Sequence, residues 1–114
     1  MCEFKVYLGP QERQKLVAEE ITTAKLDGNS LVLTDILGRT IKVQGALITG
    51  VDVKSESLLL YSAPFVSELL KLFVSFERWD RNSINQLESA WKALKTTGDE
   101  VINSLKSTRE GAQG

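Results

Sequence analysis

The sequence predicts an α+β fold, with a small antiparallel β-barrel of about six or seven short strands at residues 1–62 and two or three helices after it. Up to residue 62, apolar and polar residues alternate in short runs, separated by turn residues roughly eight to twelve positions apart. From Ser62-Ala63-Pro64 onward, apolar residues recur every three or four positions, which is the period of a helix. A chain of 114 residues with 42% hydrophobic content is large enough to bury a core.

The first strand is expected at Phe4–Leu8, where apolar and polar residues alternate, and Gly9-Pro10 ends it with a turn. The short segment 16–18 is interpreted as a strand rather than as one helical turn. Residues 21–26 begin with β-branched side chains and predict a further strand. Asp27-Gly28 follows directly and is a strong signal for a hairpin turn.

Three further extended runs complete the predicted barrel, at residues 40–43, 46–53 and 58–61. Gly45 and Gly50 lie between or within these runs, and we expect bends or bulges there, because a glycine otherwise only weakens a strand. Closure of the barrel would leave no unpaired sheet edge.

The first predicted helix follows Pro64 and carries apolar residues around most of its circumference. A helix with so wide an apolar stripe needs burial on several sides. It is too short for a membrane span and includes the charged residues Glu68 and Lys71, so no membrane role is expected.

A second helix is predicted from Asn82-Ser83, because Ser83 and Gln86 have the spacing of a capping box. Its apolar residues follow alternating steps of three and four, which form a heptad-like seam. The seam positions are Ile84, Leu87, Trp91, Leu94, Gly98, Val101 and Leu105. A break at Gly98, with Thr97 starting a new helix, is the alternative.

The helices form either a plain hairpin packed on the barrel or a bundle that joins several copies of the chain, and the sequence leaves both arrangements open. The apolar residues expected at an interface between copies are Phe73, Phe76, Trp79, Leu87, Trp91 and Leu94. We assign the helical hairpin to residues 63–108 and a flexible tail to residues 109–114.

Composition narrows the class of protein. The net charge of −1 gives no global attraction to nucleic acid or to an anionic membrane. A single cysteine cannot form an internal disulfide, and charged residues interrupt any apolar signal sequence near the start, so a cytoplasmic protein is expected.

The single thiol belongs to Cys2, the second residue of the chain. With Met1 removed, the free amine and the thiolate of Cys2 would chelate a metal ion, and with Met1 retained its amine and the Cys2 amide nitrogen would flank the same sulfur. Such nitrogen and sulfur donors suit Ni(II) or Cu(II) better than Mg²⁺ or Ca²⁺. The chain has no histidine, so a homodimer that brings two copies of Cys2 together is the simplest way to complete the site.

Three segments together resemble the CooT family of small β-rich proteins, which are also catalogued as predicted RNA-binding proteins. These are Met1–Leu8, Leu33–Gly38 and Ile48–Val53, and the resemblance extends over residues 1–62. It implies a homodimer that binds nickel through Cys2 of each subunit, in a role linked to nickel delivery to carbon monoxide dehydrogenase. With the helices added, the chain is expected to form a homodimer or a higher homo-oligomer. The helices from about residue 63 depart from the short members of the family.

Two other functions are compatible with such a chain. A small barrel can bind single-stranded RNA on a curved face with aromatic and basic side chains, and the helices could instead dock a client protein as an adaptor. An enzyme with Cys2 as nucleophile is not expected, because the chain has neither histidine nor a recognisable oxyanion hole.

Overall fold

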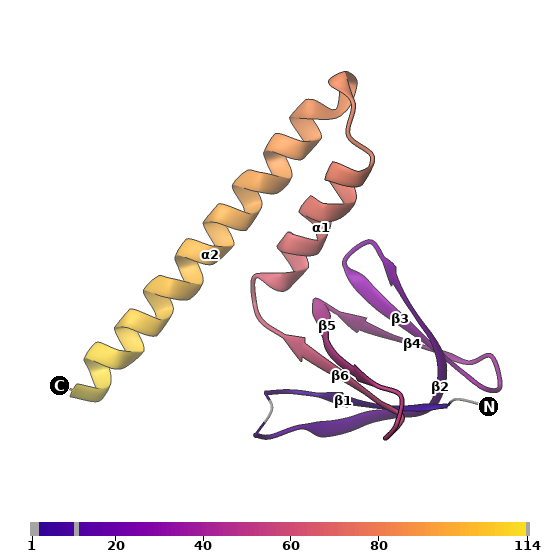
Figure 1. Ribbon diagram of the computed structural model, residues 1–114. Helices are drawn as coiled ribbons and strands as arrows, with labels where there is room; N and C mark the ends of the chain where they lie inside the picture. The colour runs from indigo at the N-terminus through magenta and orange to yellow at the C-terminus, as the bar shows by residue number, and fades with distance from the viewer. Residues whose placement is uncertain (1–2, 11, 114) are drawn as a thin grey trace.

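The computed structural model describes residues 3–10 and 12–113 and has an α+β fold, with a six-stranded sheet followed by two helices (Figure 1). A short 3₁₀ helix, η1, immediately precedes the second helix. The strands are β1 (Phe4–Leu8), β2 (Lys15–Asp27), β3 (Ser30–Asp35), β4 (Thr40–Gln44), β5 (Ala46–Asp52) and β6 (Ser57–Ser62). The helices are α1 (Val66–Glu77), η1 (Arg81–Ser83) and α2 (Ile84–Gln113).

The sheet is mixed and open, so the prediction of a closed antiparallel barrel is wrong. Its strand order is β4-β3-β2-β1-β6-β5, and β1 pairs with β6 in parallel while the other neighbours are antiparallel. The two edge strands, β4 and β5, follow one another in the chain through Gly45 alone. A hairpin needs a connection of at least about two residues. The single residue Gly45, with a φ of 66°, therefore makes a sharp bend between β4 and β5 and does not fold β5 back to pair with β4.

Alternating side chains of the sheet form the hydrophobic core. In β3 the buried residues are Leu31 and Leu33, in β6 they are Leu58 and Leu60, and Val6 of the central strand β1 is fully buried. This is the period of two that predicted the strands. The core therefore lies within the residues that the sequence assigned to the β-domain.

Local features of the sheet agree with the glycine and turn signals. Asp27 pairs with Ser30 across a two-residue turn in which Gly28 has a φ of 63°, which confirms the predicted hairpin. The register between β5 and β6 shifts at Gly50, which confirms a bulge there. The segments 16–18 and 21–26 are parts of one long strand, β2.

The second helix begins differently from the prediction. The N-cap is Asp80, not the Asn82-Ser83 pair, and it caps η1, which leads directly into α2. The Asp80 carboxylate accepts hydrogen bonds from the amides of Asn82 and Ser83, both at 2.9 Å. The Ser83 hydroxyl accepts from the amide of Asp80 and completes the capping box. Ser83 is thus the last residue of the box, so Gln86 has no place in it. The expected alternative break at Gly98 is absent, since α2 runs through it.

Helix α1 is fixed to the sheet at its N-terminal end. Val66 and Leu70 are 2% and 3% exposed, and the Asn29 side-chain amide donates to the Ser67 hydroxyl at 2.6 Å. The rest of the hairpin projects from the sheet, and α2 extends well beyond α1 (Figure 1). The radius of gyration is 17.1 Å, against about 13 Å for a compact chain of this length. None of the described helices is long and apolar enough to cross a membrane.

Candidate functional site

Cys2, the predicted metal ligand, lies outside the described residues, but the strand that follows it is well defined. β1 begins at Phe4 and is hydrogen bonded on both sides, to β2 and to β6. The Lys5 amide donates to the Glu56 carbonyl at 2.9 Å, and Val6 is fully buried. In the sequence, Cys2 comes two residues before the start of this central strand.

The hollow beside the start of β1 is rich in carboxylates. Its acidic residues are Glu3, Glu19, Glu20 and Glu56, and Lys5, Tyr7, Ser55 and Ser57 complete its lining. Within residues 3–10 and 12–113, no cluster of three or more histidine, cysteine, aspartate or glutamate side chains is arranged to hold a metal ion. The described carboxylates of this hollow are therefore not arranged as a metal site by themselves.

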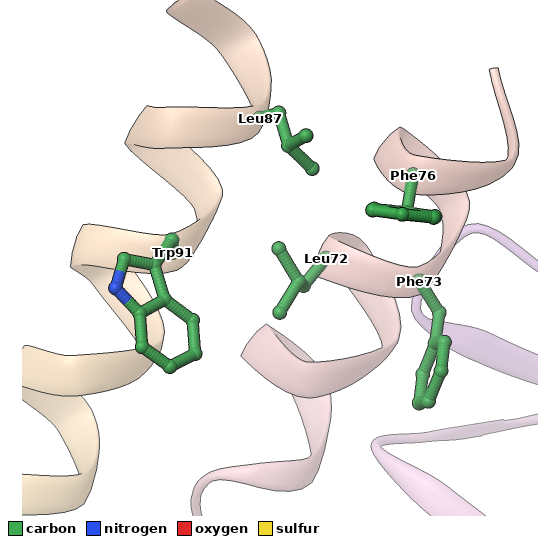
Figure 2. Close-up of a pocket in the computed structure, with 5 residues that line it drawn as sticks. All are labelled: Leu72, Phe73, Phe76, Leu87 and Trp91. Carbon is green, nitrogen blue, oxygen red and sulfur yellow. The ribbon is translucent and has the colours of Figure 1, made fainter. Parts of the chain in front are cut away.

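A second candidate site is an apolar groove of about 420 Å³ between the two helices. In Figure 2, Leu72 of α1 faces Leu87 and Trp91 of α2, while Phe73 and Phe76 project from neighbouring turns of α1. All five lining residues are apolar. The groove can therefore take up an apolar side chain or a helix face, but it offers no group for chemistry.

The structure brings together four of the six residues that the sequence placed at an interface. These four are Phe73, Phe76, Leu87 and Trp91. Trp79 is 49% exposed just beyond the end of α1, and Leu94 is half-buried one turn beyond Trp91. Leu72 was not among the predicted interface residues but lies opposite Leu87, and its spacing of four from Phe76 is the signal that could have placed it there.

Asp35 organises the turn between β3 and β4, inside one of the segments that resemble the CooT family. Its carboxylate accepts from the amides of Leu37 and Arg39, and from Arg39 Nε at 2.8 Å. Desolvation raises the pKa of the Asp35 carboxyl, but the hydrogen bonds from Arg39 and Leu37 outweigh it and hold the pKa below its ordinary value. Asp35 therefore acts in the fold of the turn.

The aromatic residues of the sheet do not form an exposed stacking surface. Phe4 is partly buried against the core and Tyr7 is half-buried, while Tyr61 is exposed. Proteins that bind single strands without sequence preference stack successive bases on aromatic side chains. The described part of the chain gives this alternative function little support.

The fold and the thiol define a class: a small β-module of six strands with one cysteine just before its central strand, extended here by a helical hairpin. The chain belongs to the CooT family, described as "CO dehydrogenase accessory protein CooT", which matches residues 1–61. This confirms the resemblance inferred from the sequence. The family is one of accessory proteins rather than enzymes.

A solved structure agrees with the fold. The crystal structure assigned to CooT from Carboxydothermus hydrogenoformans matches with a TM-score of 0.50 and 19% sequence identity. The similarity covers 54% of this chain and 98% of that chain. No protein with a curated description matches the sequence. Since the family match ends at residue 61, α1 and α2 lie beyond it.

Proposed function

We propose that this protein is a non-enzymatic nickel-binding accessory protein, in which Cys2 from each of two subunits holds one Ni(II) ion. The observation that carries the proposal is the family match, which starts at residue 1 and includes Cys2, the only cysteine of the chain. The family is described as accessory to CO dehydrogenase. Nickel is the cargo of such a protein, which would act as a metallochaperone, a store or a sensor for a metalloenzyme client.

The donor atoms near Cys2 fit this cargo. A thiolate together with backbone nitrogen is a donor set that suits Ni(II), and two copies supply two sulfurs across a two-fold axis. The carboxylates of Glu3 and Glu56 lie at the same end of β1 and give it a negative potential. That potential favours the approach of a divalent cation.

The decisive experiment is a Ni(II) titration of reduced, metal-free protein, followed by thiolate-to-metal charge-transfer absorbance and native mass. We expect saturation at about one nickel per two chains, the stoichiometry of a two-fold site. Cys2→Ser should remove both the absorbance and the binding. Because residue 2 precedes β1, the circular dichroism of Cys2→Ser should equal that of the wild type.

Two results would contradict the proposal: the absence of nickel binding, or binding that survives in Cys2→Ser. A salt-dependent shift with single-stranded RNA, unchanged in Cys2→Ser, would then favour the nucleic-acid alternative.

The helical hairpin is the second part of the proposed function. We assign residues 63–108 to self-association, through the apolar residues of the groove together with Trp79 and Leu94. The exposure of Phe73, Phe76 and Trp79, at 60%, 67% and 49%, supports this assignment, because exposed apolar patches of this kind are typical of interaction sites.

A further inference from the structure

The residues of the seam predicted on α2 fall into two flanks that differ in their exposure to solvent. Leu87, Leu94 and Val101 form the half-buried flank. The other flank contains Ile84, Trp91 and Leu105, which are 45%, 51% and 61% exposed. At 3.6 residues per turn, α2 presents its uncovered side as one stripe with alternating steps of four and three. The stripe consists of Ile84, Glu88, Trp91, Lys95, Gly98, Ile102 and Leu105.

This stripe continues beyond the reach of α1. The 30 residues of α2 span about 45 Å, whereas the 12 residues of α1 span about 18 Å. The groove between the helices is lined by Trp91 of the stripe and by Phe73 and Phe76 of α1, with Leu72 between them in Figure 2. The four apolar stripe residues and these two phenylalanines expose on the order of 600 Å². One side of a standard protein interface buries about 800 Å².

Gly98 gives a second indication that another helix covers the stripe. It lies in the interior of α2, where glycine destabilises a helix by about 1 kcal/mol relative to alanine. A Cβ at this position would meet no atom within 4 Å, so packing in the monomer gives no reason for glycine. A helix crossing the stripe supplies one, since glycine lets two backbones approach closely.

We propose that the stripe of α2 pairs antiparallel with the same stripe of a second copy of this chain. The charges decide the direction. In a parallel pair each residue lies level with its own counterpart, which puts Glu88 beside Glu88 and Lys95 beside Lys95. In an antiparallel pair each charge can lie within one helical turn of its opposite, and opposite charges beside a helical seam set partner orientation.

One antiparallel register places the stripe from Ile84 to Ile102 against the same stretch of the second copy. With the two-fold axis near the level of residue 93, Ile84 lies level with Ile102 of the second copy. Trp91 then lies level with Lys95 of the second copy, a cation–π pairing. Glu88 is within one helical turn of that same lysine. Each contact occurs twice by symmetry.

This pairing deepens the self-association of the proposed function and requires neither Cys2 nor nickel. The test therefore uses metal-free Cys2→Ser protein and measures its mass by sedimentation equilibrium over a range of concentrations. We expect a dimer of twice 12.6 kDa. Glu88→Lys alone and Lys95→Glu alone should each raise the dimer Kd about tenfold or more, because two attractions become two repulsions. The double variant E88K/K95E should recover part of the lost affinity, because it restores the opposite charges but not the cation–π contact of Lys95 with Trp91.

Two controls keep the test sharp. Glu100→Lys changes the same charge on the opposite face of α2, where Glu100 is exposed, and should leave the mass unchanged. Helical circular dichroism checks that α2 is intact, since Glu88→Lys also removes the 3.2 Å ion pair with Lys92. A protein that is monomeric at all concentrations would overturn the proposal. So would Glu88→Lys and Lys95→Glu variants that dimerise as well as the parent protein, which is the result expected for a parallel pair. Loss of nickel binding in an otherwise normal dimer would instead count against the Cys2 site alone.

Discussion

Asp35 fastens the turn between β3 and β4 through three hydrogen bonds, two from backbone amides and one from the Arg39 side chain. Each bond is made to the ionised carboxylate, which explains why the pKa of Asp35 lies below its ordinary value although desolvation raises it. The Asp35-Ile36-Leu37-Gly38 sequence is therefore a turn whose geometry depends on one charge. This turn explains structurally why the segment belongs to the pattern that resembles the CooT family.

We predict that Asp35 makes the β-domain sensitive to acid. A carboxyl with a lowered folded-state pKa contributes stability that is complete above its unfolded pKa of about 4 and is lost as the pH falls through the folded pKa. Asp35→Asn should thus be less stable than the wild type at pH 7, and its stability should fall less between about pH 5 and about pH 3. Urea midpoints across this range measure the difference.

Asp99→Asn is the matched control for this prediction, because Asp99 is exposed on α2. Its pH profile should follow the wild type. If Asp35→Asn and the wild type lost stability in parallel on acidification, the turn would not be the acid-sensitive element.

At the level of secondary structure, the start of α2 shows how two candidate caps can be distinguished. The Asp80 carboxylate accepts hydrogen bonds from the backbone amides at the start of η1, and the Ser83 hydroxyl accepts one from the Asp80 amide. An N-cap replaced by alanine costs about 0.5–2 kcal/mol. Gln86, by contrast, lies inside the helix and is exposed.

We predict that Asp80→Ala lowers the free energy of unfolding by about 1 kcal/mol, whereas Gln86→Ala changes it little. Chemical denaturation followed by helical circular dichroism measures both. Equal effects of the two substitutions would restore the capping box that the sequence suggested.

The predictions that succeeded and those that failed differ in the range of the interactions that determine them. The Asp27-Gly28 hairpin, the Gly50 bulge and the helical period depend on neighbouring residues, so the sequence contains their signals. Barrel closure depends on whether β4 pairs with β5, and these two strands lie at opposite edges of the sheet although only Gly45 separates them in the chain. The interface residues were predicted from their spacing and remain a prediction, and spacing alone could not tell which flank of α2 faces α1. Cys2 remains a prediction because it lies outside the described residues.

On the scale of the whole molecule, the two proposed contacts between copies, the nickel contact at Cys2 and the pairing of α2, belong to different parts of the chain. β1 begins on the side of the sheet away from α2 (Figure 1). A two-fold axis at the middle of α2 therefore keeps the starts of two β1 strands apart, so the nickel contact must involve a different copy. Two distinct two-fold contacts on one chain generate a tetramer when they close.

We predict that nickel doubles the mass of the assembly. Metal-free protein should sediment as the α2-linked dimer, and one nickel per two chains should convert it to a tetramer. Cys2→Ser should remain a dimer with nickel, and Glu88→Lys with nickel should form a dimer through Cys2 alone. A wild-type mass that nickel leaves unchanged would show that the two contacts do not coexist.

The separation of β1 from α2 has a consequence for the handover of the metal. Ligand exchange requires the donor atoms of a client to reach the ion before the original ligands leave. In the proposed assembly, the α2 contact lies on the far side, so it does not cover the nickel ion held between two copies at the start of β1. Release of nickel would then part only the Cys2 contact, and each carrier would leave the encounter as an intact pair, ready to be loaded again.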